Sequence, residues 1–427
     1  MQPPRAGSRH ADLPEQSEGL LARVPFPVLR VALLVRDLAV DRHDPDLVGL
    51  RGIDDPERFV WAMLPHAART FSSCITLLPG RAARISAVAY LYCRMLDTYE
   101  DLLTDPAARD AALERFPLRL LADPAAAQAL PEAPRIAHAH VVDERDAAHL
   151  LLVERCCLVD RVFARFAAEE RRLIYDLVAS MAAGMRWSSS VFARQGGVLE
   201  NEHQLTRYCR EVIGHPVVFS LRLLRLLRRR STELPEPARQ DAMVVSEMIQ
   251  LANVTRDIEK DLLRGVAYHP LLREDLGRDV FAQRDAALTE RVRRVREQLL
   301  TMALERAPAY RELLASLGSR RLSLARASAV LMLLFTDGYY RGCGRRVGWP
   351  GWGARRSGVG LLIGALPALF SERRAETAVD RIVRAFAAAA REARARGVPL
   401  AFDTVGSAAI PAAAPETAPS RLASPAR

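Results

Sequence analysis

Apolar residues recur every three to four positions along most of the 427-residue chain, without the sustained alternation typical of β-strands. Because this spacing places apolar side chains on one helix face, the pattern predicts an all-α protein. The segments concerned are 85–103, 150–166, 171–192, 205–227, 243–263, 281–317, 322–340 and 372–396.

Changes in composition divide the chain into three parts. Residues 1–50 begin with a polar stretch and are predicted to be an N-terminal extension. Residues 51–398 hold the helical patterns and are predicted to form one domain, interrupted by an irregular Gly-, Trp- and Arg-rich segment at 342–364. The Ala- and Pro-rich tail, 399–427, is predicted to be disordered.

Two of the apolar helices each carry a row of oxygen-bearing side chains on one face. The rows are Asp97, Glu100 and Asp101, and Asn253, Asp257 and Asp261. Burying so many carboxylates unpaired would be costly, so these rows need cations. Magnesium suits them, because proteins commonly hold it with a few carboxylates plus the oxygens of a substrate phosphate. The alternative is that Arg94 and Arg256 neutralise Asp97 and Asp257 without a metal.

The net charge of +10 does not predict a nucleic-acid partner. Of the 61 basic residues only Lys260 is a lysine, and the arginines are spread along the whole chain. No basic patch interleaved with aromatic residues is present, so we expect no nucleic-acid binding.

Cysteine usage and hydropathy indicate a compartment. The six cysteines form no CxxC pair and lie mostly in apolar helical runs, which is typical of reduced thiols. The longest uncharged apolar run, 358–370, is shorter than the roughly 20 residues that span a bilayer. We therefore expect a cytoplasmic protein without a transmembrane helix.

Four motifs, taken together, resemble those of the squalene and phytoene synthases, the head-to-head trans-isoprenyl diphosphate synthases. They are Arg69-Thr70-Phe71, Arg94 to Asp101, Tyr208 to Gly214, and Gln250 to Asp261. Their order and spacing match the family over roughly residues 55–350. The resemblance implies a single large helical bundle of the isoprenoid synthase type with a central apolar cavity.

The resemblance also implies roles for individual residues. The two oxygen-bearing rows would be the magnesium ligands. Tyr208 would lie near the reacting carbons, and a C-terminal pair that contacts diphosphate would be Tyr339 and Arg356. The residues that resemble the family's diphosphate-contacting groups are Arg69, Arg94, Arg256 and Gln250, and the three arginines among them would also assist catalysis.

The activity implied is magnesium-dependent 1′-1 condensation of two allylic diphosphates, farnesyl or geranylgeranyl, through a cyclopropylcarbinyl diphosphate. The product would be squalene-like or phytoene-like, and NADPH would be needed only for a squalene-type product. Because such products are oily, contact with the membrane periphery is also expected. Chain length, product and oligomeric state are left open by the sequence.

Two alternatives remain open at this stage. One is a class I terpene cyclase, or another prenyltransferase, acting on a single allylic diphosphate. The other is a binding protein that kept the fold. The stretch from Ile213 to Val217 departs from the family's usual V-A-G-x-V-G and predicts an altered cavity. There His215 is expected to be structural or part of the cavity wall rather than a ligand.

Overall fold

The computed structural model describes residues 32–37, 45–68, 70–122, 130–136, 141, 143–283, 285–317, 322–349 and 358–398. Within these ranges the protein is helical and contains no β-strand, so the all-α prediction is confirmed. An isolated β-type bridge joins Val198 and Ala267. None of the described helices combines the length and apolar character needed to cross a bilayer.

The α-helices are α3 (Leu47–Arg51), α4 (Pro56–Ala68), α5 (Thr70–Leu77), α6 (Gly80–Leu102), α7 (Pro106–Leu118), α9 (Glu144–Glu154), α10 (Cys156–Phe163), α11 (Ala168–Arg194), α12 (Glu202–Cys209), α13 (His215–Leu227), α14 (Glu236–Leu263), α15 (Ala286–Glu305), α16 (Pro308–Ser316), α17 (Leu324–Arg346), α18 (Gly358–Phe370) and α19 (Glu372–Ala395). Short 3-10 turns, η2 (Arg119–Leu121) and η4 (Pro270–Asp275), and a π turn, η3 (Arg210–Gly214), connect some of them.

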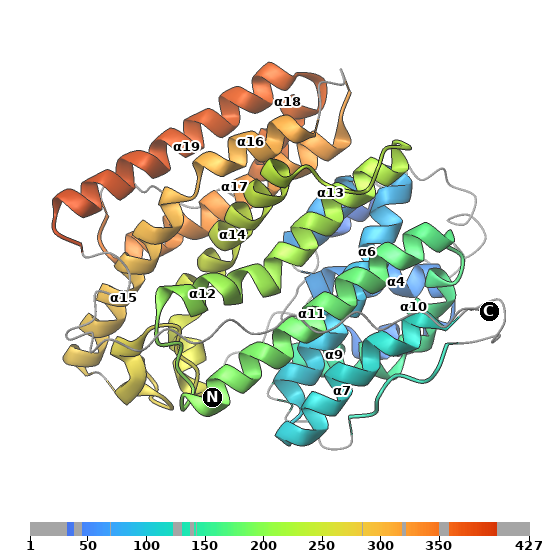
Figure 1. Cartoon of the computed structure of the whole chain (residues 1–427), viewed down its shortest axis with the longest axis horizontal. Helices are drawn as coiled ribbons and strands as arrows, with labels where there is room; N and C mark the ends of the chain where they lie inside the picture. Colours follow the sequence, from blue (N-terminus) through green and yellow to red (C-terminus); the bar gives the residue numbers. More distant parts are fainter. Residues whose placement is uncertain are drawn as a thin grey trace, which may run out of the picture.

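The helices form two packed groups with the cavity between them. Helices α4, α6, α7, α9, α10 and α11 make one group, and α14 to α19 make the other (Figure 1). Each group has its own apolar core, and side chains such as Phe71 and Leu224 contact both. The long helices α11, α13 and α14 run side by side through the middle, where α11 packs on α13 and α13 on α14.

The two helices that carry the acidic rows are long, and each buries an extended apolar face, as their apolar spacing predicts. Helix α6 buries most of its 23 residues, and α14 has 28 residues and begins with Pro237 in its first turn. Proline suits that position because the first turn has no partner for a backbone N–H. Both helices are therefore held by packing on several sides, which orients their acidic faces.

One boundary prediction was wrong. Helix α17 continues to Arg346 and α18 begins at Gly358, so much of the segment 342–364 is helical rather than irregular. Cys343 and Gly344 are buried there, and this packing outweighs the low helix propensity of glycine. The predicted helix over 205–227 is confirmed, since the chain is helical from Glu202 to Leu227 with the π turn η3 inside it.

The structure bears only in part on the predicted extension and tail. Residues 32–37 are helical and pack on the bundle, with Asp37 accepting a hydrogen bond from Ser72 Oγ. The predicted disordered tail lies outside the described residues. The three-part division of the chain stays a prediction.

Candidate active site

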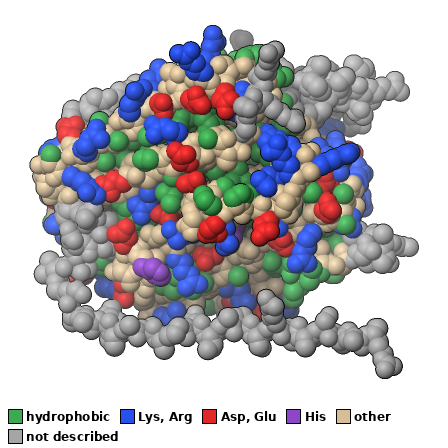
Figure 2. Space-filling model, turned by 45° about the horizontal axis from the view of Figure 1, so that its top comes forward, with side chains coloured by type: hydrophobic (Ala, Val, Ile, Leu, Met, Phe, Trp, Pro, Cys, Tyr) green, Lys and Arg blue, Asp and Glu red, His purple; other side chains and the backbone are tan. Residues whose placement is uncertain are grey.

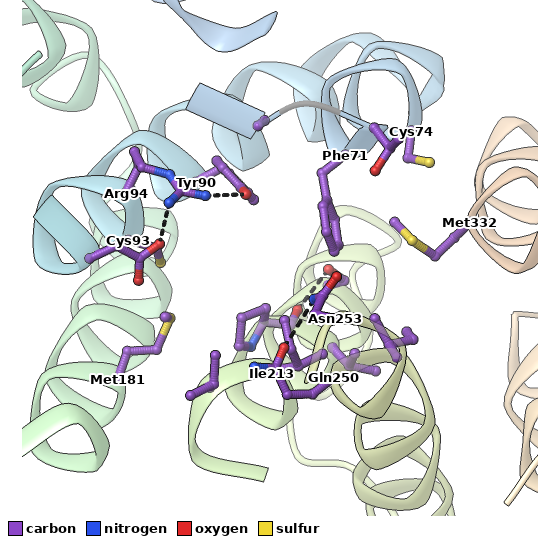
Figure 3. A pocket seen from close by; sticks show the side chains of 18 of the residues that line it. Phe71, Cys74, Tyr90, Cys93, Arg94, Met181, Ile213, Gln250, Asn253 and Met332 are labelled. Carbon is purple, nitrogen blue, oxygen red and sulfur yellow. Dashed lines mark hydrogen bonds and ion pairs between the residues drawn. The ribbon is translucent and has the colours of Figure 1, made fainter. Parts of the chain in front are cut away.

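A cavity of about 480 Å³ runs between the two groups of helices. Its wall is mostly apolar, and side chains from α5, α6, α11, α13, α14 and α17 reach it. Figure 3 shows Phe71 pointing across this space toward Asn253, with Met181 and Met332 on opposite sides. A long apolar substrate would find hydrophobic contact over most of its length here.

The first acidic row lies at the cavity wall on α6. Asp97 Oδ2 is 3.0 Å from Arg94 Nη1. Burial raises the pKa of Asp97 to about 6, although Arg94 opposes the shift and Asp101 adds to it. Glu100 accepts hydrogen bonds from Ser188 Oγ and Ser189 Oγ of α11, each at 3.4 Å. Its pKa is raised to about 8, first by burial and then by the charges of Asp101 and Asp97.

The second row faces the cavity from α14. Asn253 donates to Gln250 Oε1 at 3.0 Å, one turn earlier on the same helix. Asp257 accepts a hydrogen bond of 2.7 Å from Arg256 Nε. Burial raises the pKa of Asp261 to about 7, and the neighbouring charge of Asp257 adds to the shift.

The two rows meet at one end of the cavity. The charge of Asp101 raises the pKa of Asp261 across the gap between α6 and α14. Arg264, just beyond the end of α14, lies 3.9 Å from Asp101. The negative charges of both helices therefore act on one shared space.

This shared space fits a cation that is also bound by ligand oxygens. Within the described residues, no three His, Cys, Asp or Glu side chains converge closely enough to hold a metal ion by themselves. The arginine alternative accounts for Asp97 and Asp257, which both form ion pairs. It does not account for Glu100 and Asp261, whose pKa values are raised and which form no ion pair among the described residues. Oxygen-rich and repelling groups of this kind suit Mg²⁺ shared with a phosphate ligand.

Two of the predicted diphosphate-binding arginines lie at this end of the cavity. Arg94 donates to the carbonyl of Ala67 at 3.0 Å and to the hydroxyl of Tyr90 at 3.2 Å, as seen in part in Figure 3. The Arg256 guanidinium lies over the ring of Tyr339, 4.7 Å from its centroid. These contacts hold both guanidinium groups in place. The other two arginines predicted to bind diphosphate, Arg69 and Arg356, lie outside the described residues.

Tyr208 belongs to an aromatic cluster that the sequence did not reveal. Its hydroxyl lies 3.2 Å from that of Tyr268, and both rings pack edge-on against Phe192. Burial holds the pKa of Tyr208 well above its usual range, so its hydroxyl stays protonated. Tyr268 could not be predicted from the sequence, because it lies in an irregular segment after α14 where helical periodicity gives no signal.

The segment that departs from the family pattern contributes to the cavity wall. Ile213 and Val217 line the cavity, with Ile213 in the π turn η3. His215 is not among the lining residues and bonds to Glu211 Oε2 at 3.0 Å. This contact agrees with the structural role expected for His215.

Comparisons with known proteins address the family. The family model described as squalene/phytoene synthase matches residues 64–338, which is more than half of the chain. No curated protein sequence matches. The fold is similar to that of the squalene synthase TcSQS with ligand BPH1237, at 18% sequence identity and a TM-score of 0.54, covering 78% of this chain and 99% of that one. TcSQS with ligand E5700 gives 19% identity, a TM-score of 0.54, and coverage of 79% and 100%.

These structural likenesses, at such low identity, bear on the fold alone. The family match carries the classification, and it overlaps all four motifs. The chain belongs to the squalene/phytoene synthase family, and it is a prenyltransferase-type enzyme with the helical isoprenoid synthase fold.

Proposed function

We propose that the protein catalyses magnesium-dependent head-to-head condensation of two allylic isoprenyl diphosphates, farnesyl or geranylgeranyl. One observation carries this proposal: acidic rows from α6 and α14 share a single space at the end of a largely apolar cavity. That space would take the diphosphate groups, while the apolar part would take the prenyl chains.

The proposed metal ligands are the six residues of the two rows. Asp97, Glu100 and Asp101 would act from α6, and Asn253, Asp257 and Asp261 from α14. Neutralising the charge of the departing diphosphate is the chemistry that bound magnesium supplies. Because the pKa values of Asp97 and Asp261 are raised by burial and by neighbouring carboxylates, a cation here relieves an unfavourable arrangement.

The arginines would assist departure of the leaving group. The C1–O bond of one allylic diphosphate breaks, and the diphosphate leaves with the electron pair. Arg94 and Arg256 are held near this point and can donate charge-assisted hydrogen bonds to the developing negative charge. Arg69, Gln250, Tyr339 and Arg356 are proposed to complete the diphosphate contacts.

The carbocation left behind would be stabilised by aromatic and apolar groups. Its attack by the double bond of the second substrate, with loss of a proton, would form the cyclopropylcarbinyl diphosphate. Tyr208 and Tyr268 line the cavity with neutral hydroxyls, and neither is a tyrosinate that would capture the cation. The surrounding Leu, Ile and Met side chains exclude water, which would otherwise quench the cation.

The metal assignment can be tested with matched aspartate variants. Asp97→Asn and Asp257→Asn keep side-chain size but remove a charge from each row. We expect each to lower diphosphate release by at least about 100-fold. Asp110→Asn is the control, because Asp110 is a surface aspartate paired with Arg186, away from the cavity. Diphosphate release should stop when magnesium is chelated. Turnover at the wild-type level in either row variant would refute the assignment.

Product analysis separates the proposal from its alternative. The protein is incubated with farnesyl or geranylgeranyl diphosphate, with and without NADPH, and the extract is analysed by mass spectrometry. Coupling of two substrates gives a hydrocarbon with twice the carbon number, whereas a class I cyclase gives a product of unchanged carbon number. Dependence on NADPH would identify a squalene-type product.

A further inference from the structure

Helix α18 is apolar on both of its faces. Leu361, Ala365 and Ala368 are buried against the bundle, as expected for a surface helix. The opposite face carries Val359, Ile363, Leu366 and Phe370, which are 51%, 61%, 41% and 63% exposed. The helix contains no charged residue. A helix that is hydrophobic all round is normally covered on every side, so this face is unusual for a protein surface.

The apolar stripe defined by these four residues continues onto the segment that precedes α17. Leu322, 63% exposed, precedes α17, and Ser323 N donates to Leu369 O at 3.0 Å. The buried Arg326 donates to Ala368 O at 2.8 Å, satisfying a carbonyl at the end of α18. Leu322 and Phe370 are therefore held at one edge of the molecule. A rigid apolar surface of this kind needs no conformational change to contact a partner.

Basic side chains flank this edge. Arg373 and Arg374, three and four residues after Phe370, are exposed in the first turn of α19. Along α19 six arginines stand against four acidic residues, so that helix carries net positive charge. Near the other side, Arg228 donates to Leu317 O at 2.8 Å, which places the exposed Arg229 and Arg230 close to the same edge. On the face seen in Figure 2, hydrophobic, basic and acidic side chains are interspersed.

We propose that the apolar stripe of α18, with Leu322, is a docking surface for a lipid bilayer that contains anionic lipids. The stripe would enter the interfacial region of the bilayer, and the flanking arginines would contact anionic headgroups. A second copy of the chain fits less well. The exposed face of one 13-residue helix is about 20 Å by 10 Å, or about 200 Å², against the roughly 800 Å² per partner of a stable interface. Two such arginine-flanked faces would also repel each other.

The surface lies at the apolar end of the cavity. Leu313, Leu317 and Ala325 line the cavity. On either side of Ala325, Ser323 and Arg326 donate hydrogen bonds to the backbone carbonyls of Leu369 and Ala368 at the end of α18. Helix α17 lines this end of the cavity and also packs against α18. The inference of a docking surface rests on the exposure and charge of these residues and does not depend on the proposed reaction.

Vesicle sedimentation with the full chain tests the inference. The probes are phosphatidylcholine vesicles with and without phosphatidylglycerol. The double variant Ile363→Ser, Phe370→Ser should lower partition to anionic vesicles by at least about tenfold, because two large apolar side chains are lost from the stripe. Replacing Arg373 and Arg374 by glutamine should lower it about fivefold per arginine, and only with anionic vesicles.

The matched control is the double variant Val48→Ser, Phe281→Ser, which removes two exposed apolar side chains outside the stripe. It should bind vesicles like the wild type, and all variants should melt at unchanged temperature. Failure of the wild type to bind anionic vesicles overturns the inference, and so does equal binding by the Ile363, Phe370 variant. Light scattering supplies a third outcome: a wild-type dimer that this variant converts to a monomer would show that the stripe binds a second copy instead.

Discussion

Gly197 and Ala267 together position Tyr268 in the cavity. Ala267 N donates to Gly197 O at 2.8 Å, and Leu199 N donates to Ala267 O at 3.0 Å. These two hydrogen bonds fix the backbone next to Tyr268, whose hydroxyl lies against that of Tyr208. Gly197 has φ of +87°, and an added Cβ would lie 2.3 Å from the carbonyl oxygen of Gly265. A residue with no catalytic group thus decides where an aromatic ring of the site lies.

Gly197→Ala should therefore both destabilise the protein and impair the site. The strain of a positive φ is about 1–2 kcal/mol, and the clash with a backbone atom should bring the total above about 3 kcal/mol. Gly277→Ala is the control, because Gly277 has φ of +76° but open space around its Cα. Urea unfolding and product formation are measured for both. Equal loss of stability in the two variants would contradict the role given to the contact with Gly265.

At the scale of elements, a buried ion pair joins α6, η2 and α10. Asp160 of α10 accepts hydrogen bonds from Arg119, including one of 3.1 Å from Nη1, and from the hydroxyl of Tyr92 on α6 at 2.8 Å. Arg119 also donates to the carbonyl of Pro131 at 2.7 Å. Because all three partners are buried, the cluster holds the back of α6, opposite the face that carries the acidic row.

Asp160→Ala should lower the free energy of unfolding by about 3–5 kcal/mol, because it leaves the Arg119 guanidinium buried without its carboxylate. The comparison is Asp110→Ala, which breaks the exposed ion pair with Arg186 and should cost at most about 1 kcal/mol. Chemical denaturation monitored by circular dichroism measures both. A similar small loss in the two variants would show that the buried cluster contributes little.

The π turn η3 is the element that most changes the expected cavity wall. The predicted helix over 205–227 forms, and within it the chain passes from α12 through the π turn into α13. The turn ends at Gly214, where an added Cβ would lie 2.7 Å from Met243 Sδ of α14. Ile213 and Val217, on either side of Gly214, line the cavity. The consequence of Ile213 for substrate length stays a prediction.

At the scale of the whole molecule, one buried histidine should make stability depend on pH. His269 is 2% exposed, and its Nδ1 accepts a hydrogen bond from Leu271 N at 3.1 Å. Burial, helped by the charge of Arg294, lowers its pKa to about 4, against an ordinary value near 6.5. Between these two pH values the unfolded chain therefore binds a proton at His269, whereas the folded protein does not. The contribution of His269 to the free energy of unfolding is therefore fully present above pH 6.5 and is lost as the pH falls toward 4.

His269→Asn keeps an acceptor for Leu271 N and removes the titration. Relative to this variant, the wild type should lose about 2 kcal/mol of unfolding free energy between pH 7 and pH 5. The raised pKa values of Asp97 and Asp261 act in the opposite direction, but they contribute equally to both proteins. His203→Asn, at an exposed position, is the control, and urea midpoints at several pH values give the measurement. Parallel pH profiles for the wild type and the His269 variant would rule out this effect.

Local periodicity was sufficient to predict the all-α class and most of the long helices. A helix repeats every 3.6 residues whatever surrounds it, so the spacing alone places Asp97 beside Asp101 and Asp257 beside Asp261. The motifs also predicted which two helices carry the polar end of the site. The helix ends near 342–364 and the π turn η3 were missed, because packing against other helices decides them.

Contacts between distant parts of the chain account for the remainder. That the two acidic rows share one space depends on how α6 packs relative to α14, more than 100 residues later. The bridge between Val198 and Ala267 holds the backbone beside Tyr268, which contacts Tyr208, and no described helix packs over the outer face of α18. Periodicity within a segment is a local property of the backbone, whereas burial is a property of all segments packed together, and so it emerges only in the folded molecule.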